Sequence, residues 1–170
     1  MSMIGNYVMT DEQTIRKIES GDLLAEDVLL GENEESFLQQ SGLCIDKAWH
    51  AIHFTLTGEI GYSDKPLGKA VMHTQFLGCE EDMFGESPLM YLTPSQVKET
   101  NTVLQSVLEE DFKAEFDVSA MLKEGVYPVT EEDNEEPEIF LEFCMQYFPS
   151  LKEFFAKAAD KDRCVIFFVE

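Results

Sequence analysis

The chain has 170 residues, of which 44% are hydrophobic and 13 are phenylalanine, so it can build one well-packed domain over residues 1–170 and is too apolar to be disordered. Its 34 Asp and Glu residues against 12 Lys and Arg give a formal net charge of −22. This charge excludes general nucleic-acid and anionic-membrane binding, and it favours solubility and association with a basic protein partner.

The N-terminal third contains one predicted strand and two predicted helices. The short apolar segment Met3–Met9 predicts a strand. Thr10 is a candidate N-cap for a helix over Asp11–Ser20, and Asp22–Leu30 predicts a second, shorter helix. The polar segment Glu32–Gln40 predicts a loop or a frayed helix.

A helix is predicted over Asp46–Thr57, in the segment that holds the only tryptophan. Asp46 is a candidate N-cap or first-turn acid, and Gly58 suits the left-handed position that follows a helix end. Apolar and aromatic side chains recur with helical spacing along one face, at Trp49, Ile52, His53 and Leu56.

The same helix carries the candidate catalytic residues Asp46, His50 and His53, whose spacing allows all three to share one broad face. They would act as an acid–base group or a metal site, together with residues brought close by folding: Tyr62, His73, Glu81, Asp82 or Tyr91. The structural alternative, which we favour, is a buried His53 bonded to backbone and a His50 at the boundary of the core. Candidate binding residues are Trp49, Tyr62 and Tyr91.

The middle of the chain contains a loop over Glu59–Pro66, a helical turn or strand over Leu67–Met72 and a strand over Leu89–Leu92. Between them, Gly78–Pro88 is predicted to be an irregular loop. Its acids include Glu80, Glu81, Asp82 and Glu86. Oxygen-rich loops can bind divalent cations, but the spacing does not match a calcium-binding loop, so we favour a solvated acidic loop.

The C-terminal half is predicted to be mainly helical. A capping box at Thr93 starts a helix that we expect to reach about Asp111, with an inner face of Val97, Leu104, Val107 and Leu108. Further predicted elements are a short helix over Val118–Lys123, a solvated acidic loop over Glu131–Glu138, a helix over Glu138–Ala159 kinked or split at Pro149, and a central buried strand over Cys164–Val169.

Several segments in this order resemble the YfbM-like family of bacterial proteins, a domain of unknown function. They are MSMIGNYV, IDKAWHAIHFTLTG, KPLGKAV, YLTPSQV, VYP and CVIFFV. The resemblance spans nearly the whole chain and implies a compact single-domain α+β fold, with helices packed on a small mixed or antiparallel sheet. It supplies neither a reaction nor catalytic residues.

The sequence predicts a cytoplasmic protein without a bound metal or cofactor. Its apolar runs are too short to span a membrane, its start lacks a secretory signal, and its cysteines form no close pair. Nucleophile-elbow, phosphate-loop, zinc-protease and dinucleotide motifs are absent from the sequence.

Three functions remain open from the sequence. We favour an acidic binding module that acts as an inhibitor or immunity-type partner of a basic protein. The second is the small enzyme using Asp46, His50 and His53. The third is a structural or regulatory subunit that dimerises through aromatic residues of the last helix, although we favour a core position for most of them. These residues are Phe140, Phe143, Phe148, Phe154 and Phe155.

Overall fold

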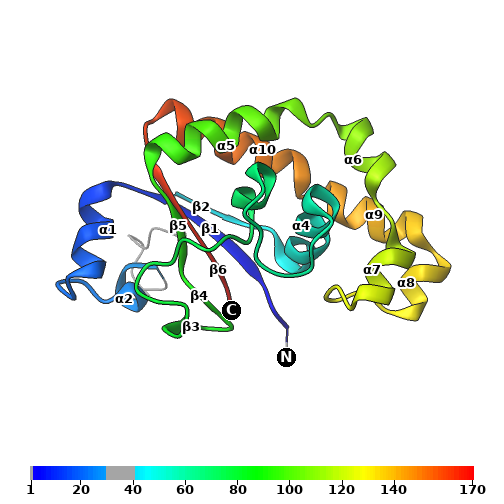
Figure 1. The fold of residues 1–170 in the computed structure, drawn as a ribbon, viewed down its shortest axis with the longest axis horizontal. Coiled ribbons are helices and arrows are strands. Elements are labelled where there is room, and N and C mark those ends of the chain that lie inside the picture. Colours follow the sequence, from blue (N-terminus) through cyan, green and yellow to red (C-terminus); the bar gives the residue numbers. More distant parts are fainter. Residues whose placement is uncertain (1, 30–40) are drawn as a thin grey trace.

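The computed structural model describes residues 2–29 and 41–170, and its centre is a four-stranded antiparallel sheet (Figure 1). The strand order is β2 (Gly42–Cys44), β1 (Gly5–Thr10), β6 (Cys164–Val169) and β5 (Met90–Leu92). The segment Glu32–Gln40, predicted to be a loop or frayed helix, lies outside the described residues.

Strand β6 is the interior strand that the apolar run CVIFFV predicts, because all six of its residues are buried and it pairs with both β1 and β5. Its side chains alternate between two hydrophobic clusters. Those of Val165, Phe167 and Val169 join the larger cluster, and those of Cys164, Ile166 and Phe168 join the smaller one. A strand covered on both faces needs a continuous apolar run rather than an alternating one.

The larger cluster lies under three helices with long apolar faces: α4 (Trp49–Thr57), α5 (Pro94–Ser106) and α10 (Phe148–Asp160). Two 3-10 helices, η1 (Asp46–Ala48) and η2 (Pro66–Ala70), adjoin α4. In Figure 1 these elements lie on one side of the sheet, and α5 and α10 run alongside each other.

The opposite face of the sheet has a lighter cover. Helices α1 (Glu12–Glu19) and α2 (Ala25–Leu29) each bury an apolar residue in the smaller cluster. A hairpin of two short strands, β3 (Met83–Phe84) and β4 (Ser87–Pro88), lies beside them. The Phe84 ring of this hairpin packs edge-on against Phe168. This arrangement makes the protein α+β, a single compact domain with helices on both faces of a small antiparallel sheet.

Four short helices extend from one end of this body, at the right of Figure 1. They are α6 (Glu109–Glu115), α7 (Val118–Glu124), α8 (Glu131–Glu135) and α9 (Pro137–Met145). Stacking of Phe112 in α6 on Phe148 in α10, at 4.1 Å between ring centroids, fastens α6 to the body. Within the described residues, no helix has the length and apolar character needed to cross a membrane.

Several predicted elements are placed differently by the structure. The helix that starts at Thr93 ends at Ser106 rather than near Asp111, because Val107 is extended, and Leu108 is 58% exposed instead of buried. The predicted acidic loop after Thr130 forms the short helix α8, since Thr130 and Asp133 make a reciprocal capping box. The helix predicted to kink or split at Pro149 is split, with α10 starting at Phe148.

Other corrections concern strands and caps. Strand β2 was not predicted, and the loop over Gly78–Pro88 contains the small hairpin β3–β4. Helix α1 is capped by Asp11, whose carboxylate accepts a hydrogen bond from the Thr14 backbone N–H, rather than by Thr10, the last residue of β1.

The aromatic side chains that were candidates for a dimer face belong to the core, which is the placement that we favour from the sequence. Four of the five rings are buried: Phe140, Phe148, Phe154 and Phe155. The fifth, Phe143, is half-buried and packs edge-on against Tyr147.

Close contact between β1 and α4 makes Gly5 intolerant of a side chain. An added Cβ would lie 2.7 Å from the Cβ of Trp49 and 3.0 Å from its Cγ. We expect Gly5→Ala to lower the free energy of unfolding by about 1–3 kcal/mol in urea denaturation. Gly61→Ala is the control, because nothing lies within 4 Å of its added Cβ, and an equal effect of the two substitutions would contradict the prediction.

Candidate functional site

Asp46 takes the second of its two predicted positions, in the first turn, which belongs to the 3-10 helix η1 that precedes α4. Asp46 has a positive φ of 49° and lies in η1, and its carboxylate accepts hydrogen bonds from the Lys47 backbone N–H (2.8 Å) and the Tyr147 hydroxyl (3.4 Å). At the other end, Gly58 has the expected left-handed φ of 72°. Asp46 therefore holds the turn before α4 and the start of α10, and its hydrogen bonds are made to these groups rather than to the two histidines.

His50 joins two segments of the backbone. Its Nδ1 accepts a hydrogen bond from the Tyr127 N–H at 3.0 Å, which places the ring proton on Nε2, and this Nε2–H donates to the Ile60 carbonyl at 2.8 Å. Burial lowers the pKa of His50, so the ring stays neutral. Both ring nitrogens are thus used in holding the loop after α4 and the segment before α8.

His53 makes the matching contact one turn further along α4. Its Nε2 donates to the Gly61 carbonyl at 2.7 Å, and the ring is fully buried. Burial lowers its pKa to about 4. Its Nδ1 has no hydrogen-bond partner among the described residues, so a proton on this atom would be buried and unpaired.

His73 is the third buried histidine, and it lies close enough to His53 for their charges to interact. Its Nδ1 accepts the Gln75 N–H at 3.2 Å, and its pKa is lowered to about 4, first by burial and then by Lys69. His50 and His53 thus fasten the segment after α4 as neutral groups, whereas the hydrogen bond of His73 is to a residue of its own turn. For His53, bonding to backbone is the role that we favour from the sequence.

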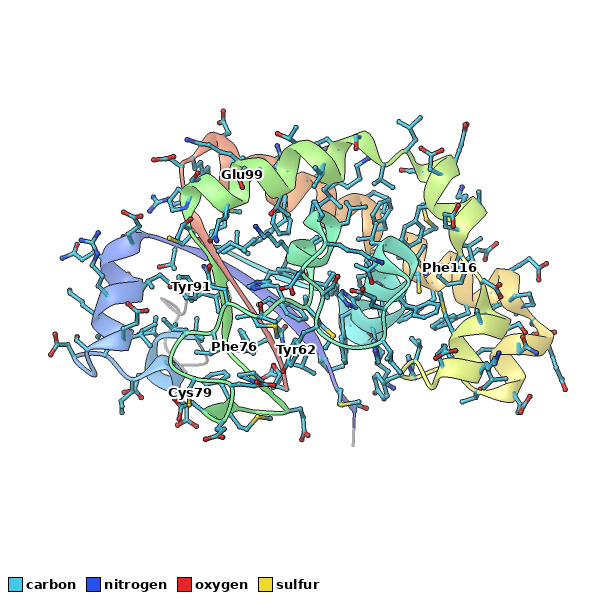
Figure 2. The ribbon with its side chains drawn as sticks, viewed as in Figure 1. Tyr62, Phe76, Cys79, Tyr91, Glu99 and Phe116 are labelled. Carbon is cyan, nitrogen blue, oxygen red and sulfur yellow. The ribbon has the colours of Figure 1, made fainter. Side chains whose placement is uncertain are left out.

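The three candidate binding residues do not share one site. The indole N–H of Trp49 donates to the Met3 carbonyl at 3.1 Å, and its ring stacks on His50. Tyr62 packs against Phe76, as Figure 2 shows, and lines with Trp49 a cavity of about 110 Å³. Tyr91 packs against the smaller cluster on the other face of the sheet.

The acidic loop forms local contacts. The Asp82 carboxylate accepts a hydrogen bond from the Cys79 backbone N–H at 3.0 Å, which lowers the pKa of this carboxyl. Among the residues that the structure describes, no group of three or more His, Cys, Asp or Glu side chains is arranged to hold a metal ion. This finding covers Glu80, Glu81 and Glu86 as well.

Helices α6–α9 carry a concentration of acids that the sequence analysis did not single out as one surface. We call residues 109–145 the acidic lobe. It contains 13 Asp and Glu residues against two lysines, Lys113 and Lys123, and thus carries half of the net charge of the chain. Twelve of the 13 acids are exposed, the exception being the half-buried Asp133.

A hollow of about 220 Å³ lies where the acidic lobe meets the body, and we call it the lobe hollow. Apolar side chains line it from three elements and the turn before α6: Leu56 from α4, Leu67 from η2, Phe112 from α6, and Val107. Asp111 and Glu115 stand at its edge. The sequence predicts a continuous helix through Val107 and Leu108 and therefore gives no sign of this hollow. In the structure, the break between α5 and α6 forms part of the wall of the hollow.

Comparisons with known proteins place the chain in a family. The model of a family described as "Domain of unknown function (DUF1877)" matches residues 1–168. The crystal structure of YfbM from Escherichia coli, a protein of unknown function, is similar with a TM-score of 0.71 and 19% sequence identity, over 98% of this chain and 99% of that chain. Curated proteins give no match. With the family model covering almost its entire length, the chain belongs to the YfbM-like DUF1877 family.

Proposed function

We propose that this protein is a binding module for a basic protein, which it contacts through the acidic lobe and the lobe hollow. An inhibitor or immunity-type role follows if the partner is a basic enzyme whose active surface is covered. The observation that carries the proposal is the gathering of half the net charge on one exposed lobe that borders an apolar hollow. Complementary charge accelerates encounter, and a desolvated apolar centre supplies affinity.

Helix electrostatics explains only part of this charge. Seven of the 13 acids lie in the first turns of α6, α8 and α9, where the helix dipole stabilises them. However, α6, α7 and α8 each end in a glutamate, at Glu115, Glu124 and Glu135. A negative charge is unfavourable at a helix C-terminus, so these three positions favour a role for the charge outside the fold.

The lobe hollow would take an apolar side chain of the partner. Val107 lines the hollow, and the next residue, Leu108, is 58% exposed beside it. Asp111 and Glu115 also line the hollow and are placed to meet basic side chains around such an anchor. This pattern of an apolar centre and a charged rim is typical of protein interfaces.

The test compares two variants with the same change of charge. We expect Glu115→Gln/Glu124→Gln/Glu135→Gln to fold normally but to weaken binding of a basic partner by about tenfold or more in low salt. The control, Glu19→Gln/Glu26→Gln/Glu99→Gln, removes three exposed acids outside the lobe.

Wild-type and variant proteins are used as baits in the same host extract, and the affinity for each recovered partner is then measured by calorimetry across salt concentrations. A partner retained by wild type and control but lost by the lobe variant supports the proposal. Equal retention by all three baits, or recovery of no salt-sensitive partner, contradicts it.

We also propose a reducing, cytoplasmic location. All four cysteines are free thiols in the structure, with Cys44 and Cys79 exposed and Cys144 and Cys164 buried. Exposed free thiols are most compatible with a compartment that keeps them reduced.

A further inference from the structure

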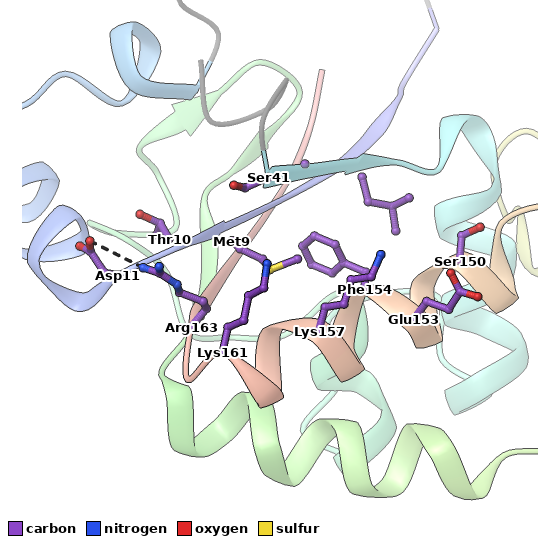
Figure 3. A pocket seen from close by; sticks show the side chains of 12 residues that line it. Met9, Thr10, Asp11, Ser41, Ser150, Glu153, Phe154, Lys157, Lys161 and Arg163 are labelled. Atoms are coloured by element: carbon purple, nitrogen blue, oxygen red, sulfur yellow. Dashed lines mark ion pairs between the residues drawn. The ribbon is translucent and has the colours of Figure 1, made fainter. Parts of the chain in front are cut away.

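A second hollow, of about 630 Å³, is lined by three basic side chains and by the carboxylates of Asp11 and Glu153, whereas most of the surface is dominated by acids. It lies between the β1–β2 end of the sheet and α10, and its lining includes Lys157, Lys161 and Arg163 (Figure 3). We call it the basic hollow. A chain with a net charge of −22 has only 12 cationic Lys and Arg side chains, and three of them meet here.

The two lysines approach the hollow from one helix face. Lys157 lies in the last turn of α10 and Lys161 follows four residues later, so both side chains stand on the same side. Figure 3 shows the two lysine side chains extending from α10 towards β2. Like charges at this spacing repel each other, and an anion between the two amino groups would relieve the repulsion.

Arg163 faces a carboxylate at a distance that leaves its N–H donors available. The Asp11 carboxylate is fixed by the Thr14 backbone N–H at 2.7 Å, and its other oxygen faces Nη1 of Arg163 at 3.9 Å. This is an ion pair but too long for a hydrogen bond, so the guanidinium retains its N–H donors for another acceptor.

The rest of the lining suits a ligand with an organic group rather than an inorganic ion. Met9, Leu43 and Phe154 supply apolar surface, and Ser41 and Ser150 supply hydroxyl groups. The volume is in the range of sites for small molecules.

We propose that the basic hollow binds a small organic phosphate. Lys157, Lys161 and Arg163 hold the phosphoryl group, and Met9 and Phe154 contact its organic part. The three cations outnumber the carboxylates of Asp11 and Glu153, so the lining has a net positive charge that suits an anion. Arginine and lysine are the usual side chains for phosphate. This site is separate from the acidic lobe and does not depend on the proposed function.

The test uses phenyl phosphate as probe, with phenol as its neutral analogue, titrated into isotopically labelled full-length protein at physiological salt and followed by NMR. We expect phenyl phosphate to shift the resonances of Met9, Leu43 and Phe154, and phenol to leave them unchanged. Lys157→Gln/Lys161→Gln should raise Kd by about tenfold. The control Lys17→Gln/Lys123→Gln removes two exposed lysines elsewhere and should retain the wild-type Kd. Equal weakening in both variants, shifts spread over the surface, or absence of saturation overturns the proposal.

A second variant tests the role of Asp11. Asparagine is an equally good N-cap, so Asp11→Asn keeps α1 while removing the carboxylate that competes with the ligand for Arg163. We expect phenyl phosphate to bind about threefold more tightly to this variant. Unchanged or weaker binding in a folded Asp11→Asn protein shows that Arg163 does not contact the ligand and overturns the three-cation site.

Discussion

Acidification from pH 7 to pH 5 is expected to lower the free energy of unfolding by about 2 kcal/mol for each of His53 and His73. Both rings are buried and neutral, with a pKa of about 4 in the folded protein against the ordinary 6.5. Between these pH values the unfolded chain binds more protons than the folded one, so stability is fully present above pH 6.5 and is lost as pH falls towards 4. Urea denaturation at a series of pH values measures the effect.

Two variants separate this effect from the titration of carboxyl groups. His53→Gln keeps an N–H donor for the Gly61 carbonyl, and His73→Asn keeps an acceptor for the Gln75 N–H, but neither side chain titrates. In each variant, the loss of free energy of unfolding between pH 7 and pH 5 should be about 2 kcal/mol smaller than in the wild type. Glu59, which faces His53, and Lys69, which faces His73, remain in both proteins. A dependence on pH as steep as that of wild type in both variants would show that the histidines are not responsible.

Patterns confined to one segment of the sequence predicted the fold well. The run Cys164–Val169 indicated a strand buried on both faces, and the capping box at Thr93 marked the start of α5. Gly58 marked the end of α4. In each case the residues that determine the structure are neighbours in the chain, so their chemistry is visible without knowledge of the fold.

Features that depend on distant contacts could not be predicted in this way. Strand β2 has only three residues, and it is a strand because it pairs with β1. The partners of His50 come from the segments around Ile60 and Tyr127, so spacing within α4 suggested a catalytic group where the structure has a backbone clamp. The two hollows likewise combine side chains from several elements and have no signal in any one segment.

Phe112→Ala is expected to cost about 3–5 kcal/mol in the free energy of unfolding, because it removes a ring that is 1% exposed and leaves a cavity. This ring stacks on Phe148 at 4.1 Å and packs against Phe116, which Figure 2 places at the acidic lobe. For a chain of this size the loss corresponds to a fall in Tm of about 10 °C in thermal denaturation. Ile139→Ala in α9, at a side chain that is 61% exposed, should change stability by less than about 0.5 kcal/mol.

The same substitution links the stability of the lobe to its binding role. Phe112 is both the anchor of α6 and part of the lining of the lobe hollow, so its loss would detach the rim acids Asp111 and Glu115 from their fixed positions. Leu108→Ala, by contrast, removes an exposed side chain next to Val107 and should leave Tm almost unchanged while weakening a partner that covers the turn beside the hollow. If Phe112→Ala cost less than about 1 kcal/mol, α6 would not be held by this contact. The acids would then form a flexible charged surface rather than the fixed rim of a binding site.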